Sequence, residues 1–91
     1  MKVNGKEVGF LWSIGAFCDY NDYIVVNPDV SLARANVYKA ALMTKAYADA
    51  NGGEFLTVEE LNGLPVYVLA EIVEEVNKAE QAGSTRTVET E

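Results

Sequence analysis

Residues 29–50 constrain the fold more than any other stretch of the chain. Apolar and small side chains recur there at helical spacing in two adjoining stripes. One stripe consists of Val30, Ala33, Val37, Ala40, Ala41, Thr44, Tyr47 and Ala48, and the other of Leu32, Ala35, Leu42, Met43 and Ala46. Asp29 suits a helix N-cap, and Asn51-Gly52-Gly53 suits a helix end. The pattern predicts a helix of about 30 Å that other elements must cover on more than one side.

The N-terminus carries a hairpin signal. Asn4-Gly5 lies between residues of strand character, and both residues adopt the positive φ of a tight primed turn easily. Because an isolated hairpin is marginal in water, we expect it to lie on a helix or to gain a third strand. Residues 23–26, Tyr-Ile-Val-Val, are the candidate for that strand.

A short helix is predicted over residues 11–20. Apolar side chains recur there at helical spacing, namely Phe10, Ile14 and Phe17, with Leu11, Trp12 and Cys18 beside them. Gly15 costs about 1 kcal/mol in a helix interior, which indicates either close packing of another backbone or a later start. The polar residues 19–22 are expected to end this helix.

Two further helices are predicted after the double glycine. Thr57 and Glu60 have the spacing of a capping box, which starts a short helix that Gly63 closes. Pro65 suits the first position of the next helix, which is expected to end at Gly83. That helix carries an apolar stripe opposite its charged residues, formed by Leu69, Ile72, Val73, Val76 and Ala79.

These elements predict an α+β fold that is mostly α. An N-terminal β-hairpin, with a candidate third strand, packs on three to four helices. Residues 1–83 form a single small domain, and residues 84–91 are predicted to be a flexible acidic tail.

The distribution of charge argues against a nucleic-acid partner. The net charge is −7; residues 1–53 hold five acidic and five basic side chains, whereas residues 54–91 hold nine acidic and two basic ones. Phosphate backbones would be repelled there, and no basic stripe compensates. The longest apolar run, residues 64–70, is too short for a membrane span or a signal-peptide core, so we expect a cytoplasmic protein with no membrane partner.

The residues for common catalytic chemistry are missing. The chain has no histidine, and its single cysteine, Cys18, gives neither a disulfide nor a redox pair. Cys18 is expected to be a small buried hydrophobic residue. Adjacent acids such as Glu59-Glu60 do not face each other on a helix, and no phosphate-binding loop occurs. We therefore predict a non-enzymatic protein with no cofactor and no catalytic site.

Residues 49–60 have the length of an EF-hand loop. Asp49, Asn51, Thr57 and Glu60 fall at ligand positions of such a loop. Gly53 and Glu54, however, stand where an oxygen ligand and the bend-forming glycine are needed. The segment is explained better as a helix stop followed by a helix cap, and a degenerate calcium loop is the alternative.

Three stretches carry a resemblance to a known family. They are residues 3–10, Val-Asn-Gly-Lys-Glu-Val-Gly-Phe; residues 56–61, Leu-Thr-Val-Glu-Glu-Leu; and residues 82–89, Ala-Gly-Ser-Thr-Arg-Thr-Val-Glu. With a long helix between the first two and an amphipathic helix before the third, the chain resembles the small tail assembly chaperones of long-tailed bacteriophages and prophages.

The resemblance implies a function inside a bacterial host cell. Such chaperones coat the hydrophobic, helical tape measure protein, keep it soluble, and recruit the tail tube protein that displaces them. They self-associate, and many are also made in a longer, frameshifted form. The alternative from another class is a small adaptor or regulatory domain that binds one partner through a helix face, with or without the degenerate calcium loop.

A chaperone of this kind needs apolar contact residues. A groove between the long helix and the stripe of the last helix is one candidate, and exposed aromatic side chains are another, although for each aromatic taken singly core packing is the favoured interpretation. The predicted protein-binding residues are Trp12, Phe17, Tyr20, Tyr23, Tyr38, Tyr47, Leu69, Val73 and Val76.

Overall fold

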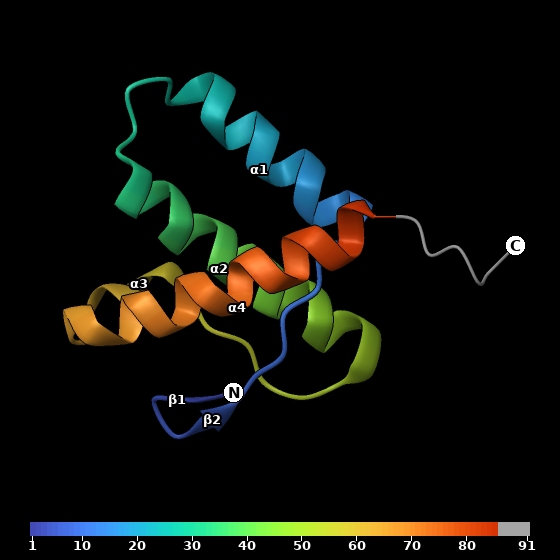
Figure 1. The fold of residues 1–91 in the computed structure, drawn as a ribbon, viewed down its shortest axis with the longest axis vertical. Coiled ribbons are helices and arrows are strands. Elements are labelled where there is room, and N and C mark those ends of the chain that lie inside the picture. Colours follow the sequence, from blue (N-terminus) through green and yellow to red (C-terminus); the bar gives the residue numbers. More distant parts are fainter. Residues whose placement is uncertain (86–91) are drawn as a thin grey trace, which may run out of the picture.

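The computed structural model describes residues 1–85 as a hairpin packed on four helices (Figure 1). The elements are, in chain order, β1 (Lys2–Val3), β2 (Lys6–Glu7), α1 (Ile14–Val26), α2 (Leu32–Asn51), α3 (Val58–Asn62) and α4 (Val66–Ser84). The predicted fold class, mostly α with a small β part, is confirmed. Residues 86–91, most of the predicted tail, lie outside the described part of the chain, and Ser84 belongs to α4.

The long helix α2 is the element on which the others pack. α1 lies along one side of it, and α3 and α4 pack against another side (Figure 1). The buried cluster that joins them consists of Val3, Val8, Ala40, Met43, Leu56, Leu61, Ile72 and Val76. The expectation that α2 is covered on more than one side is confirmed.

The two ends of α2 differ in how well the sequence predicted them. Gly52 ends the helix with a φ of 80°, which a side chain disfavours, and the predicted stop is confirmed. The predicted N-cap was wrong, because Asp29 lies in the α1–α2 loop and the helix begins after Ser31. The Ser31 Oγ accepts a hydrogen bond from the backbone N–H of Arg34 at 3.2 Å, as an N-cap requires.

The predicted hairpin is confirmed. Asn4 and Gly5 have φ angles of 53° and 78°, and Val3 pairs with Lys6 in an antiparallel register. Val3 and Val8 are buried in the core, so the hairpin is held by its packing on the helices rather than by a third strand.

The third strand predicted over residues 23–26 was wrong, because these residues form the last turn of α1. Tyr23 stacks on Tyr38 of α2 with ring centroids 3.9 Å apart. Ala16, Tyr20, Tyr23 and Ile24 share the face of the helix that packs on α2, whereas Val25 and Val26 are exposed. Packing has overridden the local strand preference.

The bounds and the buried face of α1 also differ from the prediction. The helix begins three residues later than predicted, after the N-cap Ser13, and continues six residues past Tyr20. Its apolar residues at positions 14, 17 and 18 point away from α2, so the prediction of a buried Cys18 was wrong and Cys18 is exposed. The small Ala16, not the larger residues, makes the close contact.

A buried threonine connects the loop after α2 to the helix. Thr44 Oγ1 accepts a hydrogen bond from the backbone N–H of Leu56 at 3.0 Å and donates to the Ala41 carbonyl at 3.1 Å. Both Thr44 and Leu56 are fully buried. The hydroxyl therefore satisfies a backbone donor that water cannot reach, and it fixes where α3 starts.

The last two helices follow their predicted signals closely. The capping box is confirmed: Glu60 N–H donates to Thr57 Oγ1 at 3.1 Å, and Thr57 N–H donates to Glu60 Oε1 at 3.2 Å. Gly63 closes α3 as predicted, whereas Pro65 is the N-cap of α4 rather than its first helical residue. Near the other end of α4, Gly83 lies against the backbone of Trp12.

We predict that Gly83→Ala destabilises the protein, although alanine is the better helix former. An added Cβ atom would lie 2.7 Å from the Trp12 carbonyl oxygen, so the backbone must shift, at a cost of about 1–3 kcal/mol. Gly15→Ala is the matched control, because the nearest atom to its added Cβ, Ser13 Oγ, is 3.9 Å away. That change should stabilise by about 0.4–1 kcal/mol. Urea unfolding measures both, and a stabilising Gly83→Ala would contradict the close contact.

We also predict that Thr44→Val lowers the free energy of unfolding by about 1–3 kcal/mol, because the buried N–H of Leu56 loses its acceptor. Valine has nearly the same shape and is more apolar, so packing alone predicts no loss. Thr44→Ser keeps the hydroxyl and measures the contribution of the methyl group. Amide hydrogen exchange at Leu56 should accelerate in Thr44→Val only; equal protection in both variants would refute the role of the hydroxyl.

Candidate functional site

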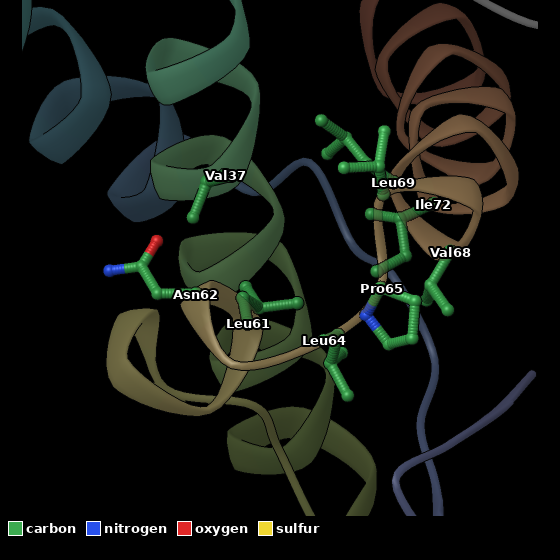
Figure 2. Close-up of a pocket in the computed structure, with 9 residues that line it drawn as sticks. Val37, Leu61, Asn62, Leu64, Pro65, Val68, Leu69 and Ile72 are labelled. Carbon is green, nitrogen blue, oxygen red and sulfur yellow. The ribbon is translucent and has the colours of Figure 1, made fainter.

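An apolar pocket lies where α2, α3 and the start of α4 meet (Figure 2). Its volume is about 160 Å³. Figure 2 shows Val37 of α2 facing Leu69 and Ile72 of α4 across the pocket, above the α3–α4 turn. The lining consists of Val37, Leu61, Asn62, Leu64, Pro65, Val66, Val68, Leu69 and Ile72. Asn62 is the one polar member, so the pocket suits an apolar side chain.

The floor and the rim of the pocket differ in accessibility. Ile72 and Leu61 are buried and form the rigid inner part, whereas Val66 is 85% exposed at the edge. Tyr67, the next residue, is 69% exposed. Exposed apolar residues beside an apolar pocket extend the surface that a partner would cover.

Of the predicted residues on α4, Leu69 lines the pocket. Val73 lies one helical turn further along and is half-buried. Val76 is 0% exposed and belongs to the core, so it presents no surface to a partner. The predicted groove between α2 and α4 corresponds to this pocket at its α3 end.

Three of the predicted aromatics form one cluster at the α1 end of the molecule. Trp12 makes edge contacts with Phe17 and with Tyr20, at centroid distances of 5.8 and 6.0 Å. Lys39 Nζ lies 4.5 Å from the Tyr20 ring centroid and pairs with Glu80 of α4 at 3.1 Å. This cluster links α1, α2 and α4, and only Phe17 in it, at 51% exposure, offers a large free surface.

The remaining predicted aromatics lie at two other places. Tyr23 and Tyr38 are stacked on each other between α1 and α2. The Tyr47 ring covers Gly9, where an added Cβ atom would lie 2.5 Å from a ring carbon. No aromatic residue lines the pocket, so the predicted residues do not converge on one site.

Sequence reasoning missed most of the pocket. Five of its lining residues were assigned only to helix ends and turns, namely Leu61, Leu64, Pro65, Val66 and Val68. Their signal was present, because residues 61–69 are apolar apart from Asn62 and Gly63. What the sequence did not reveal is that Val37, more than twenty positions earlier, closes the other side.

The candidate ligands of the EF-hand-like segment are engaged in other interactions. Asp49 belongs to α2 and pairs with Lys45 at 3.6 Å, and the Asn51 side chain donates to the Tyr47 carbonyl at 3.3 Å. Thr57 and Glu60 form the capping box. Within residues 1–85, no group of three or more histidine, cysteine, aspartate or glutamate side chains is placed to hold a metal ion.

Glu60 connects the hairpin to α3 electrostatically. Its carboxylate lies 2.8 Å from Lys6 Nζ and also accepts the backbone N–H of Thr57. The hydrogen bond from Lys6 and that from Thr57 lower the pKa of Glu60 below its ordinary value of 4.5. The folded state therefore favours the ionised carboxylate.

Comparisons of the chain with protein-family models, with curated proteins and with solved structures found no match. A membrane crossing needs a helix that is both long and strongly apolar, and none of the helices in residues 1–85 meets that requirement. The candidate site is therefore defined by its own geometry: an apolar pocket with an exposed apolar rim.

We predict that Glu60→Gln removes part of the acid sensitivity of folding. Because the folded pKa is lowered, the ionised Glu60 stabilises the fold above about pH 4.5, and this contribution is lost as the pH falls further. The variant should be less stable than the wild type at pH 7, and the difference should shrink below pH 4.5. Thermal unfolding between pH 3 and 7 measures this. Glu54→Gln, an exposed acid with no ion pair within residues 1–85, is the control and should follow the wild-type profile.

Proposed function

We propose that this chain is a non-enzymatic tail assembly chaperone of a phage or prophage. In this proposal it acts in the bacterial cytoplasm, binds an apolar helical segment of the tape measure protein, and helps to recruit tail tube subunits. The resemblance of residues 3–10, 56–61 and 82–89 to that family supplies the identity of the partners. The pocket supplies a place for an apolar side chain to bind.

The observation that carries the proposal is the composition of the pocket. Eight of its nine lining residues are apolar, and its rim continues into exposed Val66. An amphipathic helix binds to such a surface by inserting apolar anchors from one face. Burying one large apolar side chain contributes about 1.5–3 kcal/mol, so a single anchor would bind weakly and reversibly. Weak, reversible contacts suit a chaperone that a later assembly partner must displace.

The charge of the chain supports the same function. The chain has a net charge of −7 on 91 residues, and repulsion between such charged molecules keeps complexes with an apolar partner from aggregating. The charges on the outer face of α4, including Glu71, Glu74 and Lys78, are exposed and lie away from the pocket lining. The chain would therefore cover the apolar side of a bound partner and present its own charged face to the solvent.

A small adaptor domain could use the same pocket, and the two functions differ in what they do to the partner. A chaperone keeps an otherwise insoluble helical protein in solution, whereas an adaptor binds a partner that is soluble without it. The test must therefore measure the solubility of the partner as well as binding.

We predict that co-expression with the longest coiled-coil-like protein encoded near this gene makes that protein soluble, and that Val66→Asp abolishes most of the effect. Val66 is 85% exposed and is the first residue of α4, so the change should leave folding intact. Leu32→Asp is the matched control, since Leu32 is 79% exposed and is the first residue of α2, outside the pocket. Soluble and co-purified partner is quantified for the wild type and both variants.

Each outcome of this experiment decides one point. If the partner is insoluble with the wild type, or is equally soluble without it, the chaperone function is refuted. If Val66→Asp and Leu32→Asp reduce solubility equally, the chaperone function stands but the pocket is not its binding site.

A further inference from the structure

The outer face of α1 is an apolar surface that residues 1–85 leave mostly uncovered, although the Trp12 ring contacts Phe17 on it. Ile14, Phe17, Cys18 and Val25, with Asn21 among them, recur at helical spacing, and we call these five residues the α1 outer stripe. Ile14 is 84% exposed and Val25 is 78% exposed. The opposite face of the helix, with Ala16, is the one that packs on α2.

This stripe is separate from the pocket. The pocket is lined by α2, α3 and α4, and none of its lining residues comes from α1. A stripe with apolar residues at this spacing is ordinarily the buried face of a helix, and three of its five members are aliphatic or aromatic. In a small acidic protein, such an exposed face marks a surface for another helix.

The charges that α1 itself carries are of one sign. α1 contains Asp19 and Asp22 and no basic residue, and its last turn lacks the basic side chain that would offset the negative end of the helix dipole. Within residues 1–85, neither aspartate forms a salt bridge. Helical geometry places Asp22 along one edge of the α1 outer stripe, whereas Asp19 lies further round the helix, toward α2.

Three bases lie on the α2 side of α1, and one of them, Lys39, contacts the Tyr20 ring and pairs with Glu80. Arg34 lines a hollow with Tyr23 and Val26 at the α1–α2 loop. Lys45 lines a second hollow with Asp19, and its ammonium pairs with Asp49. Asp22 lines neither hollow, so it is the acid most available to a partner on the stripe.

We propose that the α1 outer stripe binds an amphipathic helix whose apolar face is bordered along one edge by lysine or arginine. The apolar side chains supply the contact area, and the basic edge pairs with Asp22. A second copy of this chain is a poorer occupant, because antiparallel face-to-face packing of two such stripes would bring their acidic edges together. This inference concerns a second surface and does not depend on the identity of the partner proposed above.

Three fluorescein-labelled helical peptides of equal length test the proposal. The first has a leucine face with lysines along one edge, the second has glutamates in place of the lysines, and the third has the composition of the first in scrambled order. Fluorescence anisotropy with the full chain should show salt-dependent binding of the first peptide and binding of the other two that is weaker by about tenfold or more.

Matched variants locate the binding surface. The double variant Ile14→Ser, Val25→Ser should weaken binding of the lysine peptide by about tenfold or more. Leu32→Ser removes a similarly exposed aliphatic side chain that lies outside both the stripe and the pocket, and it should change binding by less than about twofold. Asp22→Lys should reverse the preference, so that the glutamate peptide binds better than the lysine peptide. Positions 14, 25 and 32 are all exposed, and circular dichroism confirms that the variants fold.

Several results would overturn the proposal. It is refuted if the scrambled peptide binds as tightly as the lysine peptide, if the variant Ile14→Ser, Val25→Ser leaves binding of the lysine peptide unchanged, or if Asp22→Lys does not reverse the preference between the lysine and glutamate peptides. If sedimentation shows a dimer that Ile14→Ser, Val25→Ser dissociates, the occupant is a second copy and the proposal is wrong. Loss of peptide binding at α1 leaves the co-expression result with Val66→Asp unaffected, so the two proposals fail separately.

Discussion

The whole structure depends on the burial of two sides of α2. In a chain of 91 residues, α2 is the longest helix, and the others have no larger surface on which to pack. Ala40, Met43 and Thr44 are fully buried on it, and small residues such as Ala35 let α1 approach closely on the other side. Close packing of this kind requires that buried polar groups be satisfied. Thr44 meets that requirement by binding Leu56, and no buried side-chain nitrogen or oxygen within residues 1–85 lacks a partner.

The burial of α2 leaves the neighbouring helices only partly covered. α1 and α4 each use one face on α2, and there is no second layer of protein among residues 1–85 to cover their other faces. On most of α4 the outer face is charged, as in an ordinary surface helix. At the start of α4 and along α1 it is apolar instead. The two candidate binding surfaces are therefore two places where the sequence departs from the polar exterior that folding alone would favour.

The sequence predicted best those features that depend on local chemistry. Asn4-Gly5, Gly52 and the Thr57–Glu60 capping box act within a few residues, and all three are confirmed. The features that it predicted wrongly depend on tertiary contacts. Residues 23–26 have strand propensity, but the stack of Tyr23 on Tyr38 makes them helical. Ile14 and Phe17 belong to the apolar repeat that predicted this helix, but the close contact with α2 is made by Ala16.

The candidate site was predictable only in part, for the same reason. Leu69 was identified from the stripe on its own helix, whereas Val37 and the α3–α4 turn become part of one pocket only when α2 and α4 are brought together. The nine predicted residues are instead spread over the molecule: Val76 is in the core, Leu69 lines the pocket, Val73 is half-buried beyond it, five aromatics contact one another, and Tyr47 covers Gly9. A helical pattern tells which residues share a face, but it does not tell which neighbour covers that face.

Two separate surfaces on one small body have a consequence for affinity. The pocket of about 160 Å³ accepts one apolar side chain, and α1 offers a few exposed anchors. Each contact alone contributes a few kcal/mol before the cost of association, which gives weak binding. If one extended partner engages both, the second contact forms at an effective concentration set by the connection, and the combined affinity greatly exceeds either. Such binding is released in steps, because a competitor that takes one surface leaves only a weak contact at the other. A protein that must hold an apolar partner and then surrender it gains more from two weak surfaces than from one strong site.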